Sequence, residues 1–379
     1  MRERYQQQVK LLLDVLPFIA RSEVFSLKGG TAINFFHLDC PRLSVDIDLH
    51  YLPVNDRDTA MSDIHKNMRA IAESIEHVFV ETTAKVDPGT FNTVVSSKDV
   101  QIKIQPNTVI RGCLLPVEEK SLSPNLEQIY GKAVTVPCVA KHELYAGKLC
   151  AALGRQHPRD LFDMLLFLQG NNFSQEMMDV FVVYLISQGK PIHEQLNPNI
   201  QDIVQLFNKQ FVGMTTEVVA LERLIEVQNT LPRQVLAALN DSQREFLLGF
   251  KSGIPNWNLL PFNNIQELPA VRWKQQNLEK MDVIKKRQAM EKLQQLFSEN
   301  PHNPSRPFHQ TDKEQTVVLT PQEQLTQEIV DVLIENGLLD KAKELEVKRK
   351  FTAGQLKRED WSLYIERASA PDKSGDDND

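Results

Sequence analysis

Apolar residues recur along this chain at two different spacings, and each spacing predicts one kind of element. Residues 1–20 repeat apolar side chains every three or four positions, and residues 58–77 do the same, so both ranges are expected to form amphipathic helices. Polar and apolar residues alternate strictly from Ser44 to Leu49, which predicts a strand with one buried face. Shorter strand-like runs follow at 78–82, 91–95, 100–105 and 134–137.

The later part of the chain is mainly helical by the same criterion. Residues 140–154 repeat apolar positions at helical spacing with Gly154 as a C-terminal stop, and a second helix is expected from Arg159. Before them, a loop rich in proline and serine is expected over 116–124. Further helices are predicted over 177–186, 203–207 and 235–250.

This order of elements predicts an α+β fold, a mixed sheet with flanking helices followed by an α-helical half. With 379 residues the chain is long enough for two domains. The predicted division is an α/β domain over 1–138, a mainly helical domain over 139–296, a polar linker rich in proline over 297–323, and a helical extension with a disordered acidic tail over 324–379.

Two carboxylates lie on one face of the alternating strand. The period of two places Asp46 and Asp48 side by side, while Val45, Ile47 and Leu49 are expected to point into the core. Like charges at this spacing repel each other, so a cation between them is a natural partner. Mg²⁺ suits such a pair, because it takes one or two carboxylates together with substrate phosphates. The alternative is a pair of solvated strand positions, since aspartate is mostly exposed.

A glycine pair precedes the carboxylates. Without Cβ atoms, the backbone at Gly29 and Gly30 can approach a ligand closely, and a helix opening at Thr31 offers free N–H groups that favour phosphate. An isolated glycine pair is more often an ordinary turn. Metal ligands on a strand and phosphate donors at a helix start, in this order, nevertheless describe a nucleoside triphosphate site.

Charged residues in the predicted helices after residue 140 form the second group of candidates. Lys141 and Lys148 are seven positions apart and share a helix face. A lysine on a helix is usually a solvated charge, and Asp160 could simply favour a helix N-terminus, worth about 0.3–1 kcal/mol. Asp163 is harder to explain in this way, because its neighbours are apolar and a buried carboxylate needs a partner.

Composition narrows the class of protein. Hydrophobic residues make up 41% and charged residues 25% of the chain, as in ordinary globular proteins. The net charge of −7 does not support non-specific binding to duplex DNA, although a local patch could hold a nucleic-acid substrate. Four cysteines without a CxxC pair argue for reduced thiols, and no signal peptide or apolar run of membrane-spanning length is expected, so we predict a cytoplasmic protein without a membrane partner.

Four short motifs together resemble one known family. Their order and content are similar to the AbiEii/AbiGii abortive-infection nucleotidyltransferases, members of the DNA polymerase beta-like superfamily, toxins of type IV-like toxin–antitoxin pairs and relatives of the MenT toxins. The resemblance covers roughly residues 20–170. Its motifs here are KGGTA at 28–32, RLSVDIDL at 42–49, KLCA at 148–151 and RDLFD at 159–163.

The resemblance implies a nucleotidyltransferase sheet and transfer of nucleotides from an NTP to an acceptor, with RNA such as the 3′ end of tRNA as a family precedent. It also implies a cognate antitoxin and phage defence. Asp46 and Asp48 would hold Mg²⁺, Lys148 would neutralise phosphate charge, and Asp163 or Asp160 would position Lys148 or the acceptor. The implied nucleotide-binding residues are Lys28, Gly29, Gly30, Thr31 and Ser44.

One position departs from the family pattern. A later strand of the superfamily commonly presents a third carboxylate, expected here near position 105, where this chain has Gln105. Two other functions therefore stay open at this point: an NTP-binding regulatory protein without transfer, and a kinase that uses the same metal and phosphate groups.

Overall fold

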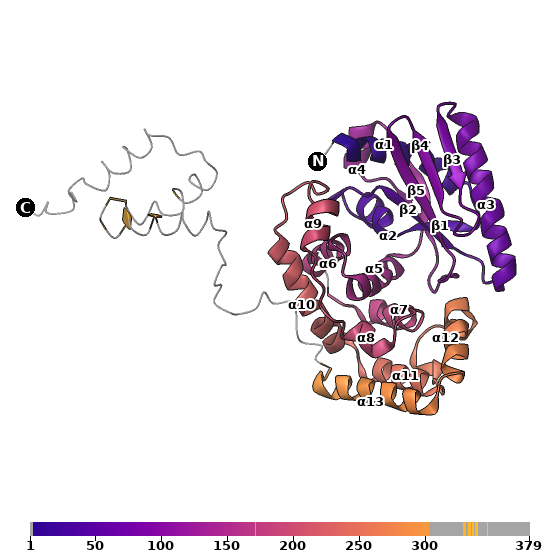
Figure 1. Ribbon diagram of the computed structural model, residues 1–379, viewed down its shortest axis with the longest axis vertical. Coiled ribbons are helices and arrows are strands. Elements are labelled where there is room, and N and C mark those ends of the chain that lie inside the picture. Colours follow the sequence, from indigo (N-terminus) through magenta and orange to yellow (C-terminus); the bar gives the residue numbers. More distant parts are fainter. Residues whose placement is uncertain are drawn as a thin grey trace, which may run out of the picture. The chain divides into compact units, whose positions relative to one another are not determined.

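The computed structural model describes residues 3–170, residues 172–302 and eight positions between 329 and 347. Contacts divide the chain into two units, residues 1–308 and residues 309–379. The first unit holds every motif named above, and Figure 1 shows its sheet and its helices. In the second unit, Val330, Leu339 and Val347 form a small buried cluster. The predicted acidic tail and most of the predicted linker lie outside the described residues.

A seven-stranded mixed sheet forms the first half of unit 1, which confirms the predicted α+β fold. Its strand order is β3-β4-β5-β2-β1-β7-β6. The central strand β2 pairs with β5 in parallel and with β1 in antiparallel orientation. The strands are β1 (Phe25–Lys28), β2 (Asp46–Tyr51), β3 (Thr82–Val86), β4 (Thr93–Ser97), β5 (Val100–Asn107), β6 (Glu118–Ser121) and β7 (Thr135–Cys138).

Helices α1 (Glu3–Ala20) and α3 (Arg57–Val78) cover one face of the sheet. Ile47 and Leu49 are completely buried beneath this face, as the alternation predicted. Val45 differs from its prediction, because β2 begins at Asp46, two residues after the predicted start, and Val45 is only half-buried. The opposite face of β2 carries the two aspartates, and Arg159 of the helical half reaches Asp46 there.

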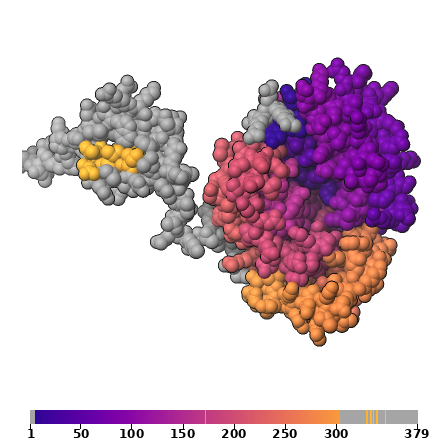
Figure 2. Space-filling view, viewed as in Figure 1, coloured from indigo at the N-terminus to yellow at the C-terminus, as the bar shows by residue number. Residues whose placement is uncertain are grey.

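The helical half begins with α5 (Lys141–Arg155), α6 (Pro158–Gly170) and α7 (Gln175–Ile186). In the space-filling view it forms one continuous body with the sheet (Figure 2). The remaining helices are α8 (Ile192–Leu196), α9 (Val204–Gln210), α10 (Leu221–Ala238), α11 (Asp241–Ser252), α12 (Pro269–Glu279) and α13 (Val283–Glu299), and the short helix α4 (Pro124–Tyr130) lies earlier, between β6 and β7.

Two predicted helix boundaries are wrong for local reasons. The predicted helix 235–250 is two helices, because the side chain of Asn240 accepts a hydrogen bond from the N–H of Gln243 and starts α11 anew. Gly154 does not end α5; the helix reaches Arg155, and Gln156 takes the left-handed conformation with φ 51°. Apolar spacing continues through both points, so it could not locate them.

Two strand predictions also differ from the structure. Residues 78–82 are not a strand, because α3 runs to Val78 and β3 begins only at Thr82. The predicted loop 116–124 contains β6, which pairs with β7 at the edge of the sheet. The sequence of β6 is EEKS, and such charged residues are a common way to protect an edge strand. Because its sequence lacks alternating apolar residues, the strand could not be predicted from the hydrophobic pattern.

The end of unit 1 is fixed by buried contacts to α13. Arg244 on α11 donates hydrogen bonds to the carbonyl oxygens of Phe297 at 3.0 Å and Asn300 at 2.7 Å. The side chain of His302 contacts the carbonyl of Ala237 at 2.9 Å. The helical half therefore extends past residue 296, the predicted end of the helical domain, because residues 297, 300 and 302 all contact it. None of the helices in the described part of the chain is both long and apolar enough to cross a membrane.

We predict that a chain truncated after residue 308 keeps the melting temperature of unit 1, whereas truncation after residue 296 lowers it by several degrees. The shorter chain leaves the buried guanidinium of Arg244 without two acceptors, at about 1–3 kcal/mol for each unmade hydrogen bond. Differential scanning calorimetry of both chains measures the effect. Equal stability of the two truncated chains would contradict the prediction.

Candidate functional site

The glycine pair forms the turn between β1 and the next helix. Gly29 has a φ of +72°, in the region that favours glycine, and α2 (Gly29–Thr31) starts at once. The antiparallel register pairs Lys28 with Asp48, which brings the carboxylate beside the turn. A Cβ atom added at Gly29 would lie 2.1 Å from Oδ2 of Asp48. Only glycine therefore lets the turn and this carboxylate meet.

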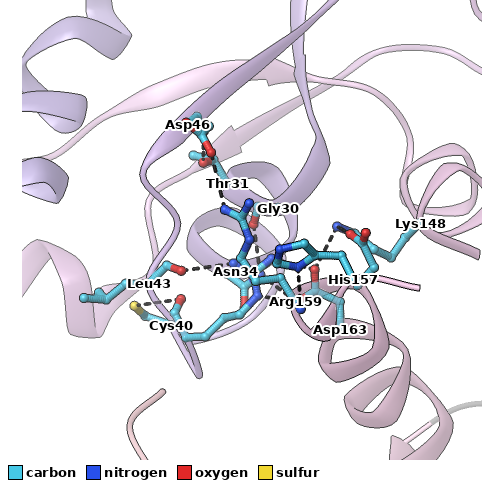
Figure 3. A network of polar contacts seen from close by, with 12 residues as sticks. Gly30, Thr31, Asn34, Cys40, Leu43, Asp46, Lys148, His157, Arg159 and Asp163 are labelled. Atoms are coloured by element: carbon cyan, nitrogen blue, oxygen red, sulfur yellow. Dashed lines mark hydrogen bonds and ion pairs between the residues drawn. The ribbon is translucent and has the colours of Figure 1, made fainter. Parts of the chain in front are cut away.

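Two buried side chains, Thr31 and Asn34, hold the rest of the turn through hydrogen bonds. The hydroxyl of Thr31 donates to the carbonyl oxygen of Asp46 at 2.5 Å, which ties the helix to β2 (Figure 3). Asn34 Nδ2 donates to the carbonyl oxygen of Gly30 at 2.9 Å. Asn34 lies in a π-helical segment, Ala32–His37, a distortion that often occurs at functional sites. Thr31 and Asn34 are fully buried, so they hold the turn in place.

Gly30 packs against side chains that come from the loop before β2. A Cβ atom at Gly30 would lie 2.6 Å from Nη2 of Arg42 and 3.2 Å from Oγ of Ser44. Both side chains are buried, with Arg42 only 2% exposed. Gly30, Thr31 and Ser44 thus lie on the buried side of the turn.

The two aspartates of β2 have different surroundings. Arg159 Nη1 lies 3.3 Å from Oδ2 of Asp46, a cationic partner that the spacing of residues did not predict. Burial raises the pKa of Asp48, and the charge of Asp46 adds to this effect, although Lys28 and Lys148 oppose it. Burial likewise lowers the pKa of Lys28. The register of β2 with β5 places Gln105 beside Asp48.

Asp163 is the centre of a buried ionic cluster. Arg42 donates to it from Nε at 2.7 Å and from Nη2 at 2.6 Å, so both carboxylate oxygens are engaged. Lys148 Nζ lies 2.9 Å from Oδ2, and Asn34 donates to Oδ1 at 3.1 Å (Figure 3). Burial alone would raise the pKa of Asp163, but the charges of Arg42 and Lys148 outweigh it and lower that pKa.

Asp160 extends this cluster toward the surface. Lys148 Nζ donates to it at 2.8 Å, and Arg155 donates from Nε and Nη2 at 2.5 and 3.0 Å. Burial opposes ionisation here too, yet the charges of Lys148 and Arg155 leave the pKa of Asp160 lowered. The cluster holds two carboxylates and three cations, so one positive charge remains uncompensated. Arg155 is 67% exposed, so the cluster reaches solvent through this side chain.

A cavity of about 820 Å³ lies between the sheet and the helical half. Four of the residues predicted from sequence line it: Lys28, Gly29, Asp48 and Lys148. The cavity lining does not include Asp46, Gly30, Thr31, Ser44, Asp160 or Asp163. Other lining residues on the sheet side include Gln105, Asn107 and Ile110. Those on the side of the helical half include Glu143, Gly147, Arg155, Tyr184 and residues 188–190.

Several residues at this site were not found from the sequence. Glu143 is 1% exposed, accepts hydrogen bonds from the N–H groups of Leu114 and Leu115, and accepts another from the hydroxyl of Tyr184. Burial raises its pKa. Arg42 lies inside a quoted motif, but nothing local showed that its partner was Asp163, 121 positions away. The apolar surroundings of Asp163 were the single available signal.

The donors present fit Mg²⁺ better than a transition metal. In the described ranges no group of three or more histidine, cysteine, aspartate or glutamate side chains could hold a metal ion. Two carboxylates on one strand face, beside a glycine turn that accepts close approach, match an ion that completes its shell with water and phosphate oxygens. Asp46 and Asp48 would hold the ion, since Asp160 and Asp163 are buried in the ionic cluster and do not line the cavity, whereas Asp48 does.

Comparison with known proteins gives one matching family and a similar fold. Residues 10–258 match the family model described as nucleotidyl transferase AbiEii toxin of type IV toxin–antitoxin systems. No curated protein matches the sequence. The fold is similar to that of MenT4, a nucleotidyltransferase toxin from Mycobacterium tuberculosis H37Rv, with 16% identity, a TM-score of 0.50, and coverage of 77% of this chain and 93% of that chain. At this identity the likeness shows the fold alone.

We predict opposite roles for Asp48 in stability and in activity. Asp48→Asn should abolish activity yet raise the metal-free melting temperature by about 2 °C or more at neutral pH, because it removes a carboxylate whose ionised form burial disfavours. This gain should shrink as the pH falls through the raised pKa of Asp48, where the wild-type carboxyl becomes neutral. Asp46→Asn is the matched control, with little change in stability. A destabilised Asp48→Asn would contradict the prediction.

A second prediction separates the two lysines on α5. Lys148 is 6% exposed and paired with two buried carboxylates, whereas Lys141 is exposed. Lys148→Met should lower turnover by about a hundredfold. It should also destabilise the fold by about 3 kcal/mol, as expected for breaking a buried ion pair. Lys141→Met should change neither quantity. Turnover assays and denaturant unfolding decide this, and a larger defect for Lys141→Met would reverse the assignment.

Proposed function

The chain belongs to the AbiEii family of nucleotidyltransferase toxins of type IV toxin–antitoxin systems, and from this premise we propose a specific reaction for its cavity. The cavity binds a nucleoside triphosphate with Mg²⁺ and transfers the nucleotidyl group to an RNA acceptor, for which the 3′ end of tRNA is the first candidate. The biological role is growth control or phage defence in the cytoplasm, balanced by a cognate antitoxin.

The observation that carries this proposal is the meeting of Gly29 with Asp48. A left-handed glycine, a helix start and a carboxylate lie in contact at the wall of a cavity large enough for a nucleotide. Backbone N–H groups at the start of the helix suit phosphate oxygens. Lys28, Lys148 and Arg155 add positive charge along the same cavity. The phosphate-binding groups and the carboxylate of Asp48 therefore face one space, and Asp46 lies next to Asp48 on the same strand face.

In the proposed reaction an acceptor hydroxyl attacks the α-phosphorus, the bond from this phosphorus to the oxygen that bridges to the β-phosphorus breaks, and pyrophosphate leaves. The hydroxyl proton passes to solvent. Mg²⁺ supplies charge neutralisation on the phosphate oxygens and activation of the hydroxyl. Gly29 and Lys28 bind the triphosphate, and Lys148 and Arg155 offset its charge. Asp163 and Asp160 position these cations and do not touch the substrate.

Gln105 beside Asp48 bears on the two other functions. A neutral amide cannot accept a proton as a third carboxylate could, so β2 and β5 together offer a metal only the carboxylates of Asp46 and Asp48. A regulatory protein that binds NTP without transfer, or a kinase, would use the same cavity. The three functions differ in which part of the nucleotide reaches the product.

Labelled nucleotides distinguish these functions. We expect purified protein with Mg²⁺, total tRNA and each of four α-³²P-labelled NTPs to give labelled RNA, and γ-³²P-labelled NTPs to give none. Asp46→Asn and Asp48→Asn serve as controls that should yield no labelled RNA. Label transferred from the γ-position would show a kinase, and nucleotide binding without labelled product from any acceptor would favour the regulatory function.

A further inference from the structure

The turn after α7 forms part of the cavity wall on the side of the helical half. Gln188, Gly189 and Lys190 all line the cavity. On the cavity side this turn is held by Lys190, whose Nζ donates to the carbonyl oxygen of Gly154 on α5 at 2.6 Å. Gln188 Nε2 also donates to the carbonyl oxygen of Tyr184 at 3.1 Å. We call residues 188–190 the wall turn.

Lys274, which lies outside the wall turn and does not line the cavity, also holds this turn. Lys274 on α12 reaches three successive carbonyl oxygens with its Nζ, those of Gln188 at 2.7 Å, Gly189 at 3.2 Å and Lys190 at 3.0 Å. An ammonium group has three hydrogens, so each carbonyl can accept one of them. The side chain is 9% exposed. The contact therefore uses the full donor capacity of a buried cation.

This lysine is unusual because its charge is buried without a counter-ion. The described residues give Lys274 no ion pair, and burial together with the nearby charge of Lys251 lowers its pKa to about 8. Burying a cation is costly unless its hydrogen bonds are satisfied. A neutral side chain would fill the same space at lower cost. The charged group differs from such a side chain in that its three hydrogen bonds fix the position of the wall turn.

α12 also lies beyond the part of the chain that the family model matches. That match ends at residue 258, whereas α12 spans Pro269–Glu279. The three contacted carbonyls lie within the matched segment, at the cavity wall. A helix outside the matched segment thus holds a wall of the cavity inside it.

From these contacts we propose that Lys274 is a positioning residue that sets the affinity of the cavity for nucleotide by fixing the wall turn. The inference depends on the proposed function only for the identity of the ligand. The wall turn bears neither metal ligands nor the glycine turn, so Lys274 acts on binding and leaves the chemical step unchanged. Lys274 itself does not line the cavity and touches no substrate.

The test compares Lys274→Met, which keeps the length and loses the charge, with Lys274→Arg, which keeps charge and donors. Lys280→Met, an exposed position at the end of the same helix, is the matched control. The full chain is titrated with each of the four common ribonucleoside triphosphates and Mg²⁺ by calorimetry. We expect a dissociation constant about tenfold higher for Lys274→Met and less than twofold changes for the other two variants.

Two further measurements separate positioning from a loss of fold. Hydrogen exchange without nucleotide should be faster at the amides of residues 188–190 in Lys274→Met, while the melting temperature stays near that of the wild type. At saturating nucleotide, kcat should remain within twofold. If Lys274→Met does not fold, Lys274→Gln, which keeps two donors without the charge, takes its place.

The inference and the proposed function fail in different ways. Wild-type affinity in Lys274→Met, or unchanged exchange at the wall turn, would overturn the inference and leave the proposed function intact. A loss of kcat without a change in affinity would also overturn it. A wild-type chain that binds none of the four triphosphates would overturn the proposed function, and with it the role of Lys274 in nucleotide affinity.

Discussion

Asp163 is fully buried, and its charge is tolerated there because Arg42 grips both carboxylate oxygens while Lys148 donates to one of them. These three residues come from the loop before β2, from α5 and from α6. Removing one partner of a buried pair typically costs about 3–5 kcal/mol, because the remaining charge is left without compensation. The cluster therefore fixes how the sheet and the helical half meet. It also determines where Lys148 presents its charge to the cavity.

Around this cluster, two kinds of position are strictly constrained. Gly29 and Gly30 have no room for a Cβ atom, since Asp48 fills the space at one glycine and Arg42 at the other. Asn34 lies buried beneath the turn and donates to the carbonyl oxygen of Gly30 and to Asp163. Of the residues at the turn, Lys28 and Gly29 line the cavity together with Asp48. Arg42, Asn34 and Asp163 thus hold the turn in place without lining the cavity themselves.

The sequence predicted what depends on local spacing. Alternation located β2 and the shared face of its aspartates, and the motifs identified the family, the enzyme class and the fold. Pairings between distant segments have no such signal: Arg42 and Asp163 are 121 positions apart, and Lys274 meets its carbonyls across more than eighty. The edge strand β6 was missed because it has no apolar alternation. Roles assigned to the site residues, Asp46 and Asp48 included, remain predictions.

We propose that Asp46 and Asp48 receive the metal while Asp163 stays a buried anchor for Arg42 and Lys148. The test is a crystal structure of the protein with Mg²⁺ and a non-hydrolysable nucleoside triphosphate. We expect metal density between the two β2 carboxylates, phosphate oxygens against Gly29, and both Asp163 contacts retained. Metal coordinated by Asp163, or a triphosphate bound away from the glycine turn, would contradict these roles.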